Sequence, residues 1–135
     1  MAGDKLYNGH DELTGLQDSV YFFPEYERRK AELRRYGKTN GLAVLSLPGN
    51  TPIEWVKEIA RFWEQSFEGV CRCKEKPGYV LMGLHEDVGD SVTNEISGVL
   101  NEKYPGINVR IVNITIDGNS GSLDEITERF FAKQE

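Results

Sequence analysis

The longest stretch of closely spaced hydrophobic positions lies near the C-terminal end of the chain, at Ile107–Asp117. Six of these eleven residues are Ile or Val, and the apolar positions change phase between Ile111 and Val112. A strand that is apolar on both sides needs cover on both faces, or a β-bulge that turns one set of side chains inward. The pattern therefore predicts a strand with packing on both faces, or a bulge at the change of phase.

Four other segments carry the sequence signals of helices. Thr51-Pro52-Ile53-Glu54 has the pattern of a capping box with proline at the first helical position, and it predicts a helix to about Phe67. A second helix is expected over about 91–103, and a second capping box at 122–125 opens a C-terminal helix. A charged helix is expected from Pro24 to about Gly37, a plausible C-terminal cap.

Three short runs read as strands. Residues 41–47 form a buried strand, and Val70–Cys73 and Tyr79–Leu84 flank a Pro-Gly turn that favours a β-hairpin. From Gly41 onward, the order of elements is that of a ferredoxin-like split βαββαβ antiparallel sheet, with an extra C-terminal helix. If Val70–Cys73 is not a strand, the order becomes βαβαβα, a three-layer α/β fold. We expect residues 1–40 to form an N-terminal arm and charged helix, and 41–135 a single α+β domain.

The hairpin version leaves one face of the sheet without helices, although the strands are apolar on both faces. Exposed residues on such a face would form a larger apolar patch than monomers usually have. We therefore expect a homodimer whose contact face includes Leu42, Val44, Tyr79 and Leu81. Cover by Phe22, Phe23 and the C-terminal helix of the same chain is the alternative.

The composition is that of a soluble globular protein, with 39% hydrophobic and 28% charged residues and a mean hydropathy of −0.50. The sequence has no apolar run of membrane-spanning length and no apolar core of a secretory signal, which favours a cytoplasmic location without membrane contact. The formal net charge of −6 disfavours binding to nucleic acid. Residues 25–38 are the exception, because they carry six basic and three acidic side chains.

One polar cluster has residue types that suit a site. His85, Glu86, Asp87 and Asp90 follow a strand and precede a helix, and Asp117 and Asn119 follow the last strand at the same end of the sheet. Carboxylates and an imidazole can bind a divalent cation or a small ligand, or perform acid–base chemistry. The alternative is that the same residues cap the helix and form solvent-exposed turns, without binding a ligand.

Cys71 and Cys73 lie on one face of an extended strand. Two interpretations are open for them: metal or redox chemistry, or simple burial as small hydrophobic side chains. Two cysteines make no disulfide framework, which agrees with a reducing compartment.

No known catalytic motif appears, so the sequence leans away from an enzyme without deciding the matter, and no cofactor is expected. The first functional hypothesis is a non-enzymatic binding or regulatory module that acts as a homodimer on a protein or small ligand. The second is a small-molecule enzyme, or a metal- or phosphate-binding protein, with a site near residues 85–90 and 117–119. The third is nucleic-acid binding through the basic residues of 28–38.

Overall fold

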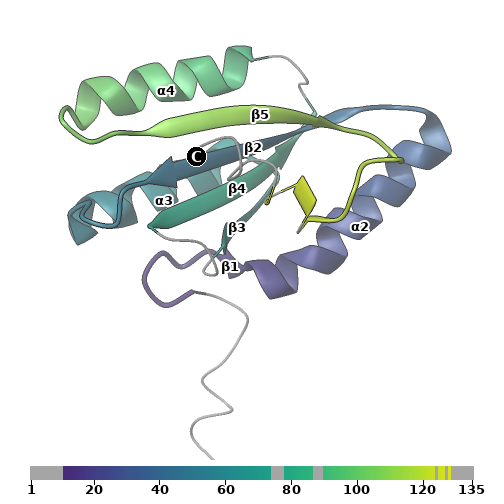
Figure 1. Cartoon of the computed structure of the whole chain (residues 1–135), viewed down its shortest axis with the longest axis horizontal. Helices are drawn as coiled ribbons and strands as arrows, with labels where there is room; N and C mark the ends of the chain where they lie inside the picture. The colour runs from purple at the N-terminus through teal and green to yellow at the C-terminus, as the bar shows by residue number, and fades with distance from the viewer. Residues whose placement is uncertain (1–10, 74–77, 87–89, 124, 127, 129–135) are drawn as a thin grey trace, which may run out of the picture.

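The computed structural model describes residues 11–73, 78–86, 90–123, 125, 126 and 128 (Figure 1). Within this part the chain has a mixed α+β fold, so the coarse class that the sequence predicted, α+β, is confirmed. No helix within it is both long and apolar enough to cross a membrane. The helices are α2 (Ser19–Tyr36), α3 (Ile53–Ser66) and α4 (Ser91–Lys103), and the strands are β1 (Gln17–Asp18), β2 (Asn40–Leu47), β3 (Gly69–Cys73), β4 (Tyr79–His85) and β5 (Arg110–Ile116).

The strands form one sheet in the order β1-β3-β4-β2-β5. β2 pairs antiparallel with β4 on one side and with β5 on the other. β3 pairs antiparallel with β4, so a strand is present where the βαβαβα alternative requires none. The short β1 runs parallel to β3 at the edge of the sheet.

β5 is covered on both faces and contains no bulge. Its register with β2 advances one residue at a time, from Ile116 opposite Asn40 to Arg110 opposite Ser46. The change of phase in the sequence therefore reflects two buried faces rather than a kink. Side chains on the α3 and α4 side are Ile107, Val109 and Ile111, and those on the α2 side are Val112, Ile114 and Ile116.

The sheet lies between two helical layers (Figure 1). α2 covers one face, where its Phe22, Tyr26 and Leu33 are buried together with Leu123 and Ile126 from the C-terminal segment. α3 and α4 cover the other face, with Trp63 and Leu100 among the buried residues there. The predicted C-terminal helix lies largely outside the described residues.

α2 begins at Ser19 rather than at the predicted Pro24, which lies inside the helix. A proline in a helix interior removes one backbone hydrogen bond and is costly on its own. Here Phe22 and Tyr26, one helical turn apart, are both fully buried against the sheet. Burial of two aromatic side chains outweighs the cost of the proline, so the apolar run before Pro24 is helical.

The expected oligomer face is instead part of the chain's own core. Leu42 and Val44 are fully buried on the α2 side, and Leu81 is fully buried on the α3 and α4 side. Tyr79 is partly buried, and the Arg72 guanidinium lies 5.1 Å from the centre of its ring. The chain's own helices and terminal segments therefore provide the cover for which a second subunit was expected.

Candidate functional site

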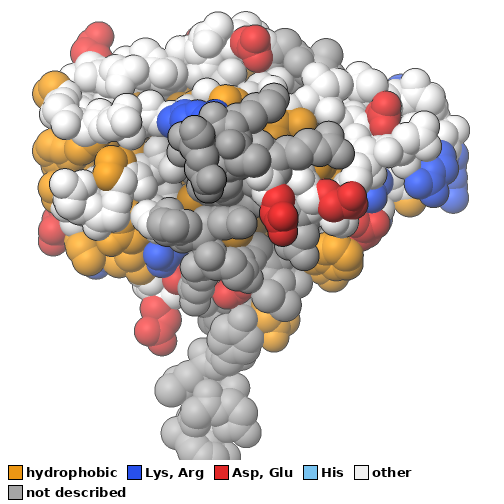
Figure 2. Space-filling model, viewed as in Figure 1, with side chains coloured by type: hydrophobic (Ala, Val, Ile, Leu, Met, Phe, Trp, Pro, Cys, Tyr) orange, Lys and Arg blue, Asp and Glu red, His pale blue; other side chains and the backbone are white. Residues whose placement is uncertain are grey.

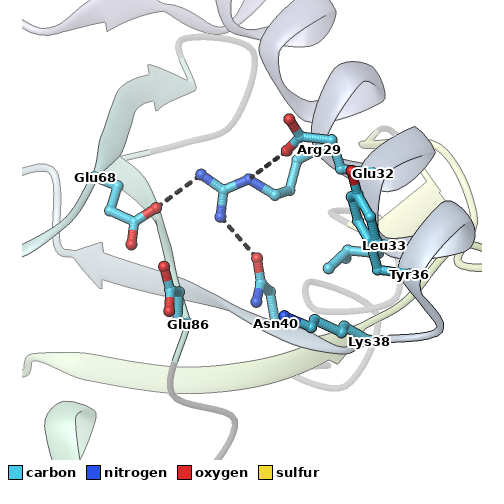
Figure 3. A pocket seen from close by; sticks show the side chains of 8 residues that line it. All are labelled: Arg29, Glu32, Leu33, Tyr36, Lys38, Asn40, Glu68 and Glu86. Atoms are coloured by element: carbon cyan, nitrogen blue, oxygen red, sulfur yellow. Dashed lines mark hydrogen bonds and ion pairs between the residues drawn. The ribbon is translucent and has the colours of Figure 1, made fainter.

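A pocket of about 330 Å³ opens beside the C-terminal half of α2 (Figure 3). Four elements meet there: α2, the turn into β2, the residue before β3 and the residue after β4. A volume of this size is at the lower end of pockets that hold small molecules. The lining residues are Arg29, Glu32, Leu33, Tyr36, Lys38, Asn40, Glu68 and Glu86.

Arg29 organises the interior of the pocket. Its Nη1 donates to Oδ1 of Asn40 at 2.7 Å, and its Nη2 donates to Oε1 of Glu68 at 2.7 Å. The Arg29 side chain is 13% exposed, whereas that of Glu68 is 46% exposed. In Figure 3 the guanidinium points away from α2 between these two partners. A guanidinium has five N–H groups, so these two bonds leave Arg29 with further donors.

The end of α2 shapes one wall of the pocket. Gly37 has φ +62°, a conformation that glycine adopts without strain, and Lys38 N–H donates to the Leu33 carbonyl at 3.0 Å. This pair forms a Schellman ending, so the predicted cap at Gly37 is confirmed. Lys38 and Tyr36, whose ring is exposed, both line the pocket at this end of the helix.

The pocket mixes opposite charges. Two cations, Arg29 and Lys38, face three carboxylates, those of Glu32, Glu68 and Glu86. The formal charge is therefore slightly negative, and the site offers hydrogen-bond acceptors as well as donors. Such a lining suits a neutral, planar, polar group better than a bare phosphate.

The polar cluster predicted from the sequence is only partly assembled. His85 is buried, and its Nε2 lies 2.9 Å from Oδ1 of Asn113 on β5. Glu86, the next residue, is exposed and lines the pocket. Asp87 lies outside the described residues. Asp90 is the residue before α4, and its backbone carbonyl accepts a bond from the Thr93 hydroxyl at 3.1 Å.

Asp117 and Asn119 lie in the loop after β5. Oδ1 of Asp117 accepts the N–H of Asn119 at 2.8 Å, and the Ser120 hydroxyl accepts the N–H of Asp117 at 2.9 Å. The carboxylate of Asp117 thus stabilises its own turn. Over the described residues, no group of three or more His, Cys, Asp or Glu side chains is arranged to hold a metal ion.

Cys71 and Cys73 lie on the same face of β3, as the strand geometry predicted. Both are buried thiols in the hydrophobic cluster beneath α2, beside Val80 and Met82. Their environment is that of core side chains.

Four of the six basic residues of 25–38 bind within the chain. Arg28 pairs with Glu25 and Glu32, and Arg29 with Glu68. Lys30 and Arg34 donate to backbone carbonyls of the loop after β5, at 3.1 Å and 2.6 Å. Lys and Arg side chains are visible at the right of Figure 2, over the end of α2. The basic segment serves mainly to attach α2 to the acidic body.

Sequence reasoning missed Arg29, Asn40 and Glu68. These residues come from three separate segments, and their spacing carries no signal before the fold is known. Of the lining residues, only Glu86 was singled out in advance as a ligand-binding residue, whereas Arg29 and Lys38 were considered only among the basic residues of 28–38, for nucleic acid.

No family model matches the chain, and no curated protein matches its sequence. Solved structures do match. The GGDEF domain of DgcB from Caulobacter crescentus in complex with c-di-GMP aligns with a TM-score of 0.68 at 18% identity, over 92% of this chain and 84% of that one. The protein has the fold of GGDEF domains.

Two further structures agree. The FimX GGDEF domain from Pseudomonas aeruginosa aligns with a TM-score of 0.65 at 14% identity, over 91% of this chain and 89% of that one. The diguanylate cyclase SiaD, in complex with its activator SiaC from the same organism, gives 0.66 at 15% identity. There the alignment covers 96% of this chain but 58% of SiaD. The string Gly-Gly-Asp-Glu-Phe, which the domain name spells in one-letter code, does not occur in this sequence.

These matches correct the leading functional hypothesis. A non-enzymatic homodimeric binding or regulatory module was expected, and that expectation is wrong. The structural neighbours are GGDEF domains, including a diguanylate cyclase and two domains whose structures concern c-di-GMP.

Proposed function

We propose that the protein binds a guanine nucleotide, with c-di-GMP as the first candidate, in the pocket beside α2. The observation that carries the proposal is the mixed lining of that pocket, on a fold shared with GGDEF domains solved with c-di-GMP.

Guanine offers chemistry that complements this lining. Its Watson–Crick edge carries N–H donors next to the O6 acceptor, and its other edge carries the N7 acceptor. A glutamate carboxylate accepts from the donors, and arginine donates to O6 and N7. Glu86 lies on the far side of the pocket from α2 and faces toward Arg29, so the two can address opposite sides of one base (Figure 3).

Tyr36 supplies a surface for stacking. Its side chain is 64% exposed at the rim, where a planar base can lie against the ring. Stacking of a base on an aromatic side chain contributes roughly 1–3 kcal/mol. Because the lining is slightly acidic, the phosphates of the nucleotide belong at the open side of the pocket, toward Lys38 and solvent.

Calorimetric titration of the full chain with c-di-GMP, GTP and c-di-AMP tests the proposal. We expect binding of a guanine nucleotide and at least tenfold weaker binding of c-di-AMP, because adenine does not offer the same donor and acceptor pattern. Glu86→Gln should weaken guanine binding about tenfold, since it replaces a charged acceptor with a neutral amide. Tyr36→Ala should weaken binding of every nucleotide that binds.

The matched control is Glu54→Gln, which makes the same chemical change at an exposed position of α3 away from the pocket. Its affinity should equal that of the wild type. The proposal fails if the wild type binds neither guanine nucleotide, or if Glu86→Gln binds as tightly as the control.

A further inference from the structure

The outer face of α4 carries a hollow that neither the core nor the α2 pocket uses. The inner residues Thr93, Ile96 and Leu100 are buried against the rest of the chain. On the opposite side of α4, the lining of the hollow is mostly polar or charged, and its apolar side chain is that of Val99, which is 44% exposed. It is lined by Asn94, Glu95, Gly98, Val99, Glu102 and Lys103.

No neighbour among the described residues requires a glycine at position 98. A Cβ at this position would meet nothing within 4 Å in that part of the chain. A glycine inside a helix costs about 1 kcal/mol relative to alanine. Close approach of another backbone to the outer face of α4 would explain its presence.

The charges on this face are arranged so that the face complements itself. Glu95, Val99 and Lys103 follow one another at intervals of four residues and form one row along the helix. When a second copy of the row runs antiparallel, with a two-fold axis at Val99, each Glu95 faces Lys103 of the other copy. Lys103 is exposed, and its ammonium group lies 5.7 Å from the centre of the ring of the buried Tyr104.

We propose that α4 pairs with α4 of a second copy of this chain, antiparallel about Val99. Gly98 allows the helices to approach at the short end of the usual 8–10 Å separation. The two Val99 side chains meet at the axis, and two Glu95–Lys103 ion pairs flank them. This surface differs from the sheet face first expected to dimerise, which the chain covers itself, and the proposal does not depend on nucleotide binding.

The dimer is expected to be weak. One pair of helices buries less than the roughly 1,600 Å² of a standard interface. Each copy also carries a net charge of −6, which opposes association. Both terms predict a weak dimer that forms only at high protein concentration.

Sedimentation equilibrium on the full chain, from low micromolar to near-millimolar concentration, measures this association. Glu95→Lys and Lys103→Glu should each weaken self-association roughly tenfold or more, because each change sets like charges against one another. An equimolar mixture of the two variants should associate again, since the chain with two lysines on the row then meets the chain with two glutamates. The double variant E95K/K103E should associate like the wild type.

Glu64→Lys is the matched control, because it makes the same charge change at an exposed position of α3. It should associate like the wild type. Circular dichroism confirms that each variant is folded, as expected for substitutions at exposed positions. A wild type that stays monomeric over the whole range overturns the proposal. Failure of the mixture to associate also overturns it, because the antiparallel arrangement about Val99 then places each lysine of one chain opposite a glutamate of the other.

Discussion

Arg72 and Asp11 lie 61 residues apart in the chain and form a buried ion pair. Nη1 of Arg72 is 3.1 and 2.9 Å from the two carboxylate oxygens of Asp11. The Asp11 side chain is 4% exposed and that of Arg72 is 15% exposed. Thr14 completes the arrangement, because its N–H and its hydroxyl both donate to Oδ2 of Asp11, at 2.9 and 2.8 Å. The pair attaches the first described turn of the chain to β3.

The ionised state of Asp11 is a source of stability. Burial alone would raise the pKa of Asp11, but the hydrogen bonds from Arg72 and Thr14 and the charge of Arg72 outweigh it, so the pKa is lowered below 3.8. A lowered folded-state pKa stabilises the protein above the unfolded-state value, and the contribution is lost as the pH falls through the folded-state value.

Asp11→Asn should therefore reduce the free energy of unfolding at pH 7 by roughly 2–4 kcal/mol, because it leaves the Arg72 charge without its partner. Urea unfolding measures the difference. The difference in unfolding free energy between wild type and variant should narrow as the pH falls from about 3.8 through the lower folded-state pKa of Asp11, because the wild type then loses the charge as well. A gap that stays constant down to pH 2 would contradict this account of the pair.

The sequence predicts the interior strands well because only one arrangement buries the apolar residues of their pattern. β2 and β5 are apolar on both faces, and only a sheet covered on both sides buries both sets of side chains. The polar contacts at the edges were not predictable in the same way. Asp11 and Thr14 form a local turn that the sequence shows, but nothing in the spacing points to Arg72 as the partner.

The expected dimer contact on the sheet face was wrong for a reason that lies in α2. The apolar stripe of α2 contains few residues, so the sequence pattern alone did not predict that this helix covers a face of the sheet. In the structure, Phe22 and Tyr26 are 0% exposed, and Leu33 is 5% exposed. Three large side chains, together with Leu123 and Ile126, cover a face that the strand pattern alone left open. The pocket beside α2 was not predicted for the same reason, because its walls form only when α2 packs against the sheet.

Gly83 in β4 is a position where a methyl group has no room. A Cβ there would lie 2.6–2.9 Å from atoms of the Phe67 side chain, which packs across the strand at the end of α3. Gly83→Ala should lower the free energy of unfolding by roughly 1–3 kcal/mol through overpacking. Thermal unfolding measures the effect.

Gly98→Ala is the contrasting variant, because its new methyl group meets open space. It should raise the stability by up to about 1 kcal/mol through helix propensity alone, when measured at concentrations too low for association. Equal effects of the two substitutions would contradict the packing assigned to Phe67.

The two predicted capping boxes differ in the structure, and so should their mutants. At the C-terminal one, Ser122 N–H donates to Glu125 at 2.9 Å, and Glu125 N–H donates to the Ser122 hydroxyl at 3.2 Å. At the other, the Thr51 hydroxyl donates to the Pro48 carbonyl at 2.7 Å, and α3 has no side-chain cap. The Thr51 hydroxyl is thus directed back to the preceding turn and does not cap α3.

Ser122→Ala should therefore cost about 1 kcal/mol, the usual contribution of an N-cap. Glu54→Gln should leave stability nearly unchanged, because the structure assigns Glu54 no capping bond with Thr51. Urea unfolding of both variants compares them directly. A loss at Glu54 as large as that at Ser122 would show that the first capping box does form.

Tyr104 joins α4 to α3 through a hydroxyl with an unusual titration. Its hydroxyl donates to Oε1 of Glu58 at 2.6 Å, and its ring lies 5.2 Å from that of Trp55. Burial raises the pKa of Tyr104 to about 12, and the hydrogen bond and charge of Glu58 act in the same direction. Because the folded-state pKa is above the unfolded value of 10.0, the stabilisation is complete below pH 10 and is lost as the pH rises toward 12.

Ultraviolet titration of the wild type and of Tyr104→Phe measures this pKa. The difference between the two titration curves should have its midpoint near 12. Glu58→Gln should lower that midpoint, because the carboxylate no longer opposes ionisation of the Tyr104 hydroxyl. A midpoint near 10 in the wild type would show that the Tyr104–Glu58 bond does not hold in solution.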